Sequence, residues 1–366
     1  MKRLGRILPD FPWDTIAEAK TTAGNHPGGV CDLSVGTPVD PAPAIGQAAL
    51  ARAADSPGYP QVWGTPALRQ AIIGYLGSRW GAAGLTEEGV TPVVGTKELV
   101  AWLPTLLGLG PGDTVVIPAV AYPTYAVGAI MVGATVVPAA TPEEVADVAP
   151  ALVWTNSPSN PTGAVDDVAR CRAWIEYARA KGAVLAADEC YGEFGWTAEP
   201  ASILHPDANA GSLDGLVAAY SLSKRSNLAG YRAGFAAGDP ELVTGLVGLR
   251  KHLGMMVATP VQAAMVALLG DQAHVIEQRG RYAARRRVLA AALKAAGFRV
   301  DLSDGGLYLW ATRGEPGRAT VSWLADRGVL VAPGDFYGDA GADHVRVALT
   351  ATDERVAAAA DRIAGG

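Results

Sequence analysis

From residue 90 onward, short apolar runs alternate along the chain with longer segments of helical pattern. The runs are rich in Val, Ile, Leu and Ala and lie at residues 93–94, 114–118, 135–137, 151–155, 183–187 and 215–220. Runs of this length, bounded by turn residues, are typical of buried strands. Continuous apolar strands separated by helices indicate a mainly parallel sheet covered on both faces. The pattern therefore predicts an α/β fold.

Beyond residue 238 the pattern changes, because helical segments follow one another before strands return. We expect helices at 241–253, 260–269 and 273–296, and strands at 307–310, 329–331 and 344–349. This predicts a large domain over residues 45–270 and a smaller α/β domain formed by residues 1–44 and 271–366. Five arginines in the long third helix are expected on a solvated face: Arg279, Arg281, Arg285, Arg286 and Arg287.

Composition and charge narrow the class of protein. At 366 residues the chain is long enough for about two domains. Hydrophobic residues make up 49% and charged residues 18%, which favours a large buried core over disorder. The net charge of -6 makes a nucleic-acid partner improbable.

Cysteines, histidines and the N-terminus argue against several other classes. Three widely spaced cysteines fit reduced thiols in the cytoplasm, and five histidines without ligand spacing predict no metal site. Residues 1–10 are basic but lack the apolar run of a signal peptide. No apolar run approaches the roughly eighteen residues that a membrane span needs. We therefore expect a cytoplasmic protein without membrane contact.

Lys224 stands where a lysine can do chemistry. It follows the apolar run 215–220, lies close to Ser221 and Ser223, and precedes Arg232 by eight positions. Strand ends of an open α/β sheet project side chains into a crevice. A lysine held there can lose its proton and form a Schiff base with a carbonyl compound. A solvated loop lysine is the commoner meaning of a lysine taken alone.

Two polar residues share this strand-end placement. Asp188 directly follows the run 183–187, and its carboxylate is costly to bury unless it meets a cation or hydrogen-bond donors. Asn160 lies after the run 151–155, in a loop that two X-Pro pairs stiffen. A helix cap could explain the aspartate and a plain turn the asparagine.

Three further features of the sequence could bind a phosphate or a flat ring. Gly95 and Thr96 open a helix, whose free backbone N–H groups can hold a phosphate, although a simple N-cap is the commoner meaning. Tyr122 offers a ring for stacking, or for ordinary core packing. Arg232 and Arg346 are expected in otherwise apolar strands, where a guanidinium needs a nearby carboxylate or phosphate to compensate for its charge.

Taken together, these residues match the groups of one ligand. Pyridoxal phosphate (PLP) carries an aldehyde, a ring nitrogen, a phenolic oxygen and a phosphate. Lys224 matches the aldehyde, Asp188 the ring nitrogen, and Asn160 and Tyr191 the phenolic oxygen. The phosphate is matched by Ser221, Ser223, Arg232 and the helix start at Gly95 and Thr96.

Three motifs support a resemblance to a known family. The chain reads Asn-Pro-x-Gly at 160–163, Asp-x-x-Tyr at 188–191, and Ser-x-Ser-Lys at 221–224 with an arginine at position 232. In these motifs it resembles the class I/II, fold type I, PLP-dependent aminotransferases. The resemblance implies a large domain with a mainly parallel seven-stranded sheet sandwiched by helices, a smaller α/β domain, and PLP bound as a Schiff base on Lys224.

The same resemblance assigns residues outside these motifs. Tyr59 resembles the tyrosine that reaches the cofactor phosphate from a partner subunit, which implies a homodimer with shared active sites. Arg346 resembles the arginine that grips the substrate α-carboxylate, and Gly36 resembles a glycine of the substrate pocket, which Asn160 also lines. Lys97 is a candidate for binding the cofactor or the distal carboxylates of the substrate.

The sequence in and around the motifs, at residues 10–14, 33–41, 156–163 and 221–234, is similar to that of the short N-succinyldiaminopimelate aminotransferases. That similarity implies transfer of an amino group from glutamate to N-succinyl-2-amino-6-oxopimelate, in lysine and diaminopimelate biosynthesis. Aminotransferases of aspartate, aromatic or kynurenine type and a PLP-dependent cysteine-conjugate β-lyase remain alternatives. A PLP-sensing transcription regulator would need a basic helix-turn-helix domain before the sheet, and only about 40 residues precede it.

Overall fold

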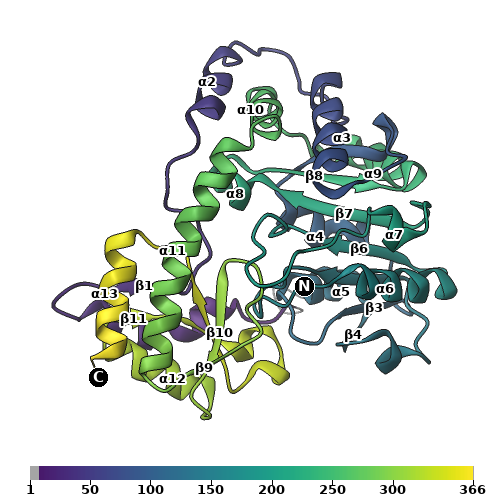
Figure 1. The fold of residues 1–366 in the computed structure, drawn as a ribbon. Helices are drawn as coiled ribbons and strands as arrows, with labels where there is room; N and C mark the ends of the chain where they lie inside the picture. Colours follow the sequence, from purple (N-terminus) through teal and green to yellow (C-terminus); the bar gives the residue numbers. More distant parts are fainter. Residues whose placement is uncertain (1–7, 366) are drawn as a thin grey trace, which may run out of the picture.

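The structure, a computed structural model, describes residues 8–365, so most of the basic N-terminal stretch 1–10 lies outside the described residues. Its main feature is a seven-stranded sheet (Figure 1). Only β8 runs antiparallel to its neighbours, whereas the other described pairs of this sheet are parallel. The predicted mainly parallel α/β fold is confirmed. In spatial order the strands are β2 (Val90–Val94), β8 (Ala233–Gly238), β7 (Leu216–Ser221), β6 (Val184–Asp188), β5 (Leu152–Asn156), β3 (Thr114–Pro118) and β4 (Thr135–Ala139).

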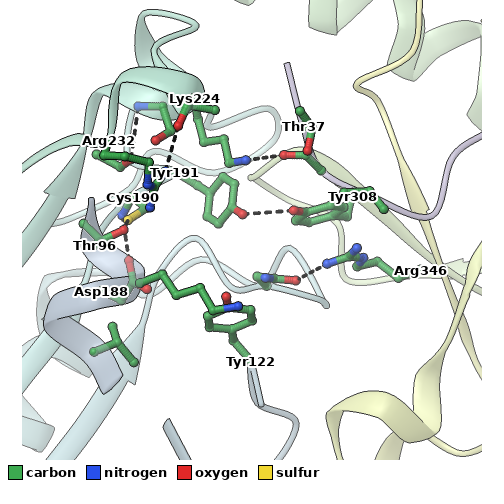
Figure 2. A pocket seen from close by; sticks show the side chains of 18 of the residues that line it. Thr37, Thr96, Tyr122, Asp188, Cys190, Tyr191, Lys224, Arg232, Tyr308 and Arg346 are labelled. Atoms are coloured by element: carbon green, nitrogen blue, oxygen red, sulfur yellow. Dashed lines mark hydrogen bonds between the residues drawn. The ribbon is translucent and has the colours of Figure 1, made fainter. Parts of the chain in front are cut away.

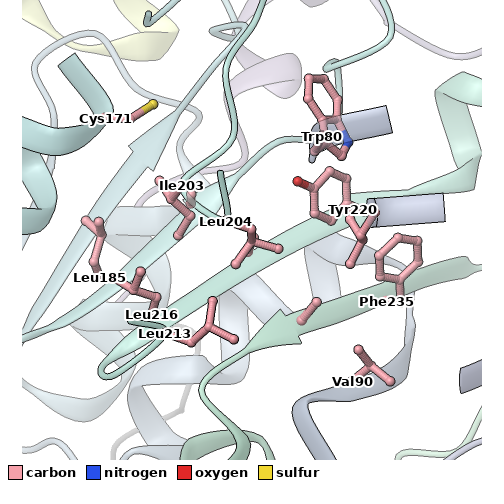
Figure 3. Packing of buried hydrophobic residues seen from close by; sticks show 14 of the residues in the cluster. Trp80, Val90, Cys171, Leu185, Ile203, Leu204, Leu213, Leu216, Tyr220 and Phe235 are labelled. Carbon is pink, nitrogen blue, oxygen red and sulfur yellow. The ribbon is translucent and has the colours of Figure 1, made fainter. Parts of the chain in front are cut away.

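Helices cover both faces of this sheet, because successive strand residues point to opposite sides and both sets are apolar. Tyr220 and Phe235 pack on one face, and Trp154 and Val217 pack on the other. Figure 3 shows the first face, where Trp80 from a covering helix lies near Tyr220. Helices α3 (Pro66–Trp80), α6 (Val168–Lys181), α7 (Pro206–Asn209) and α10 (Thr259–Leu269) contribute to that face, and α4 (Thr96–Leu106), α5 (Thr124–Val132) and α9 (Pro240–Leu253) to the other.

A second core forms around a small antiparallel sheet, to which α11 (Ala273–Ala295) runs from the region of α10 (Figure 1). We propose that the boundaries between the large and the small domain lie after residues 44 and 270. The small sheet has the order β12 (Ala332–Pro333), β13 (Val345–Ala348), β10 (Tyr308–Thr312) and β9 (Arg299–Asp301). Beside it lie the pair β1 (Cys31–Asp32) and β11 (Val329–Leu330), and the helices α1 (Ala17–Gly24), α12 (Gly317–Ala325) and α13 (Asp353–Ala364).

The remaining elements are short, apart from α2 (Ala44–Arg52), which packs against α10. α8 (Leu222–Arg225) and the 3₁₀ turn η5 (Ala229–Tyr231) follow β7 and lead into β8. The other 3₁₀ turns are η2 (Pro12–Ile16), η3 (Glu87–Gly89), η4 (Pro142–Val145), η6 (Gly334–Tyr337) and η7 (Asp339–Gly341). Within residues 8–365, no helix combines the length and apolarity that a membrane crossing requires.

The expectation of a solvated arginine face on α11 is wrong for Arg285. Its side chain is only 3% exposed and forms a bidentate ion pair with Asp40, at 2.7 and 2.8 Å. Gln278, two helical turns earlier on the same face, also donates to Asp40, at 2.8 Å. The arginine is buried because the N-terminal segment that carries Asp40 lies across α11, which the helix pattern alone could not reveal.

Asp40→Ala is expected to lower the free energy of unfolding by about 3 kcal/mol, because it leaves the buried Arg285 charge without its main partner. Asp353→Ala is the matched control. Asp353 also pairs with Arg285, at 2.7 Å, but its side chain is 74% exposed, so the expected loss is below about 1 kcal/mol. Urea unfolding followed by circular dichroism measures both. Equal losses in the two variants would contradict a structural role for the buried pair.

Candidate active site

A cavity of about 720 Å³ opens where the carboxyl ends of the parallel strands face the small sheet (Figure 2). β8 runs in the opposite direction, so its start, rather than its end, lies at this edge. The cavity brings together most of the predicted site residues: Gly36, Thr96, Lys97, Tyr122, Asn160, Asp188, Tyr191, Ser221, Ser223, Lys224, Arg232 and Arg346. Two predicted residues do not line it. Gly95 lies immediately before Thr96, whereas Tyr59 is 95% exposed in the segment between α2 and α3.

Lys224 lies on the short helix α8, directly after β7. The side chain of Ser221 caps this helix by accepting the backbone N–H of Ser223, at 3.1 Å. The Lys224 ammonium reaches across the cavity and donates to the carbonyl oxygen of Gly36. Burial in the cavity wall lowers the pKa of Lys224, and the nearby charges of Arg346 and Arg232 act in the same direction. A lysine so placed is easily deprotonated and can act as an amine.

Asp188, the last residue of β6, is a buried carboxylate that only neutral donors satisfy. The Tyr125 hydroxyl donates to Oδ2 at 2.9 Å and the Cys190 backbone N–H to Oδ1 at 3.1 Å. Burial raises the pKa of Asp188, against the effect of these hydrogen bonds. In the described part of the chain, Asp188 forms no ion pair. A cationic group of a ligand in the cavity would therefore stabilise the ionised carboxylate.

The start of α4 and Arg232 form a second polar end of the cavity. Gly95 has a φ of 73°, and a Cβ there would collide with the Arg232 guanidinium. Thr96 follows as the first residue of α4, where backbone N–H groups lack helical partners. Its hydroxyl accepts from the thiol of Cys190 at 3.0 Å. Backbone donors and a guanidinium together form a site suited to an anion such as a phosphate.

The prediction that Arg232 lies within an apolar strand is wrong. Arg232 follows the turn η5, with a φ of 55° and a ψ of 47°, and β8 begins only at Ala233. Its exposed side chain donates to the carbonyl oxygen of Ala229 at 2.7 Å. The left-handed conformation turns the chain into the strand at this edge of the sheet, and this turn brings Arg232 to the cavity.

Arg346 lies inside an apolar strand as predicted, at the centre of β13. It is 2% exposed, donates to Asn160 Oδ1 at 2.8 Å and to the Ser34 carbonyl oxygen at 2.5 Å, and keeps Nε without a partner among residues 8–365. Its guanidinium lies 4.1 Å from the Tyr308 ring centroid. The described residues supply it with no carboxylate. Its charge is therefore free to bind an anion in the cavity.

Gly36 and Tyr191 meet Tyr308 at the middle of the cavity. A Cβ on Gly36 would collide with the Tyr308 hydroxyl, so this close approach requires glycine. The hydroxyls of Tyr191 and Tyr308 lie 3.0 Å apart and point toward one another (Figure 2). Tyr122 lines the cavity and packs edge-on against Tyr125, with the ring centroids 5.9 Å apart. The exposed Lys97 lies at the rim, with its ammonium 5.9 Å from the Phe11 ring centroid.

Sequence reasoning missed several residues that line the cavity, namely Phe11, Trp13, Thr37, Cys190 and Tyr308. Tyr308 falls within the predicted apolar strand 307–310, whose pattern gives it no separate role. The pairing of β10 with β13 sets Trp310 opposite Arg346 and Tyr308 opposite Ala348. Side chains two positions apart on facing strands share a face, so Tyr308 reaches Arg346 diagonally. The register of this pair, which the pattern did not supply, was the missing signal.

Comparison with known proteins decides the family. The sequence profile described as aminotransferase class I and II matches residues 29–363. The chain belongs to the class I and II aminotransferases. It is 59% identical to a probable aminotransferase of Mycobacterium tuberculosis over 97% of this chain and 85% of that protein. It is 55% identical to the 4-dedimethylamino-4-oxo-anhydrotetracycline transaminase OxyQ of Streptomyces rimosus, over 98% and 99%. A probable N-succinyldiaminopimelate aminotransferase of Thermus thermophilus is 29% identical over 97% and 100%, with a TM-score of 0.87.

Enzymes of this family depend on PLP and move amino groups between small amino acids and keto acids. The cavity of this PLP-dependent aminotransferase offers groups that fit the cofactor. Its carboxylate Asp188 is buried without a cation, its lysine has a lowered pKa, and a helix start stands beside an arginine. These groups suit a ring nitrogen, an aldehyde and a phosphate, respectively.

Proposed function

We propose that this aminotransferase transfers the amino group of glutamate to N-succinyl-2-amino-6-oxopimelate, with Lys224 as the catalytic residue. The observation that carries the proposal is the placement of an amine, Lys224, and a buried cation, Arg346, in one cavity. The lysine with a lowered pKa lies at the strand ends, and the carboxylate-free Arg346 lies across from it on the small sheet. An amino acid held by its carboxylate at Arg346 would present its Cα to the Lys224 amine.

The cofactor would be held by the groups that the cavity supplies. When bound, PLP provides an electron sink for the electrons left on Cα after its proton is removed. Asp188 would hold the ring nitrogen, Asn160 and Tyr191 the phenolic oxygen, and Tyr122 would stack on the ring. We assign the phosphate to Gly95, Thr96, Lys97, Ser221, Ser223 and Arg232.

The chain's own residues would orient the substrate and move its proton. Arg346 binds the α-carboxylate through the guanidinium that Asn160 and Ser34 already orient. Gly36 leaves room for the Tyr308 hydroxyl, and its carbonyl oxygen accepts from the Lys224 ammonium. Lys224, neutral at a lower pH than an ordinary lysine, takes the proton from Cα. A positioned proton transfer of this kind contributes about 10²- to 10⁴-fold to the rate.

The site would be completed by a second copy of the chain. Tyr59 is 95% exposed and lies outside the cavity of its own chain. A large aromatic side chain so exposed suits contact with a partner. We propose a homodimer in which Tyr59 of each subunit reaches the phosphate end of the other cavity.

The acceptor is proposed from the cavity and from one relative. N-succinyl-2-amino-6-oxopimelate carries distal carboxylates, and the exposed ammonium of Lys97 lies at the rim without a carboxylate partner among residues 8–365. The Thermus thermophilus structure similar to this chain has a related acceptor in its name. One ammonium cannot pair fully with both the phosphate and a distal carboxylate, so we propose that Lys97 contributes to the phosphate site and pairs mainly with a distal carboxylate when the acceptor is bound.

A second candidate acceptor is a flat polycyclic ketone. The relative OxyQ, at 55% identity, is named for an oxo-anhydrotetracycline. The cavity is lined by the aromatic side chains of Phe11, Trp13, Tyr122 and Tyr308, which would stack on fused rings.

A half-reaction screen tests these proposals. Cofactor-loaded protein is mixed with single amino acids while the visible absorbance of the bound cofactor is followed, and single keto compounds are then added. We expect glutamate to bleach the band and N-succinyl-2-amino-6-oxopimelate to restore it. Restoration only by a polycyclic ketone would favour the second acceptor, and release of pyruvate and ammonia from a cysteine conjugate would favour a β-lyase. If no amino acid bleaches the band, transamination itself is refuted.

A further inference from the structure

Tyr308 touches three parts of the site at once. Its ring lies 4.1 Å from the Arg346 guanidinium, and its hydroxyl fills the space that a side chain at position 36 would need. The same hydroxyl lies 3.0 Å from that of Tyr191. Figure 2 shows Tyr308 and Tyr191 reaching toward each other from opposite sides of the cavity. The residue thus connects the small sheet, which carries Arg346, with the loop that follows β6.

The ring and the hydroxyl of Tyr308 have separable roles. A phenylalanine would pack equally well against Arg346, since that contact uses only the ring face. The hydroxyl is buried, and among residues 8–365 its only hydrogen-bond partner is Tyr191. A buried hydroxyl without a partner is costly, so this bond stabilises the arrangement of both tyrosines.

The direction of this hydrogen bond follows from the role proposed for Tyr191. Each tyrosine has a single O–H proton. If Tyr191 donates its proton to the phenolic oxygen of the cofactor, its own oxygen can only accept from Tyr308. The donors then form a chain from Tyr308 to Tyr191 to the cofactor oxygen, in which each bond polarises and strengthens the next.

We propose that Tyr308 is a positioning residue that holds Tyr191 as a donor toward the cofactor's phenolic oxygen, an inference that rests on the proposed function. Through the same side chain it supports Arg346, which binds the substrate carboxylate. The hydroxyl therefore acts on the cofactor end of the site and the ring on the substrate end.

The charged and titratable groups that face these two tyrosines come from several elements. Lys224 lies on α8 directly after β7, Arg232 lies directly before β8, and Arg346 lies on β13. The others are Asp188, Cys190, Tyr122, Tyr282 and Tyr337. Removal of the Tyr308 hydroxyl leaves all of these groups in place, so a change in titration reports the loss of that hydroxyl.

Tyr308→Phe is expected to raise the pH midpoint of the visible absorbance change of the cofactor-loaded protein by about half a unit to one unit. A weaker hydrogen bond from Tyr191 leaves more negative charge on the phenolic oxygen. That charge stabilises the proton on the nitrogen that joins the cofactor to Lys224, so this proton is lost at a higher pH. The KM for the amino acid should change less than twofold, because the ring against Arg346 is retained. Spectrophotometric pH titration and steady-state kinetics give these two quantities.

Tyr337→Phe is the matched control. Tyr337 is also buried near Arg346, 5.1 Å from ring centroid to guanidinium, but its hydroxyl has no partner in the described residues. Its variant should titrate like the parent protein. Tyr308→Phe should also have no effect in a Tyr191→Phe background, because it acts through Tyr191.

An unshifted midpoint in a folded, cofactor-loaded Tyr308→Phe variant would overturn the inference, as would an equal shift in Tyr337→Phe or in the Tyr191→Phe background. These outcomes leave the proposed function intact, since the parent protein would still titrate and turn over. If the parent protein shows no cofactor band that amino acids bleach, the proposed function fails first.

Discussion

Lys224→Ala is expected to lower turnover by up to about 10⁴-fold and to remove the visible band of the lysine-bound cofactor. The variant lacks the only lysine amine that lies at the strand ends of the cavity among the described residues; Lys97 lies exposed at the rim. Without it, Cα keeps its proton because no positioned base remains. Steady-state rates and absorbance spectra of the variant and parent measure the two losses.

Two controls separate the chemistry of Lys224 from its charge and from folding. Lys224→Arg keeps a cation but not a titratable amine, so it should be as inactive as the alanine variant. A small primary amine added to Lys224→Ala should restore part of the rate, because it supplies the missing base. Lys251→Ala, at an exposed position on α9, should behave like the parent. Normal turnover in Lys224→Ala would exclude this lysine as the catalytic residue.

Asp188→Ala is expected to weaken cofactor binding by about 150- to 5,000-fold, since loss of one partner of a buried ion pair costs roughly 3 to 5 kcal/mol. Burial raises the pKa of Asp188, and only a cationic ligand compensates for the buried charge. The protonated ring nitrogen would be that cation, and its proton makes the ring a better electron sink. Equilibrium dialysis gives the dissociation constant, and single-turnover kinetics give the rate.

Asp188→Asn and Glu189→Gln sharpen this test. The asparagine variant keeps an acceptor for the Tyr125 hydroxyl but loses the charge, so it should bind the cofactor nearly as weakly as the alanine variant. Glu189 is the neighbouring buried carboxylate, but it accepts from Tyr220 and the Ile203 N–H and does not line the cavity. Glu189→Gln should therefore retain cofactor affinity. Equal weakening in Glu189→Gln would indicate general damage to β6 rather than loss of a specific pair.

The sequence alone determined the main architecture and much of the candidate site. Apolar runs that alternate with helices predicted a mainly parallel sheet. A strand covered by helices on both faces buries all of its side chains, so its sequence is a nearly continuous apolar run. Asp188, Ser221 and the Asn160 loop all follow such runs. The carboxyl ends of parallel strands lie at the same edge of the sheet. Residues that directly follow these strands therefore come close together in the fold. The motifs around Lys224 then led to the family that the sequence profile confirms.

Only the tertiary structure decided which side chains approach the site from elsewhere. Tyr308 reaches Arg346 and Tyr191 through the register of β10 on β13, and a one-residue shift would turn it to the opposite face. Arg285 is buried because a segment more than 240 residues earlier crosses α11 with Asp40. Arg232 enters the cavity through a left-handed turn before an antiparallel strand. Such contacts join positions distant in sequence, so local patterns do not encode them.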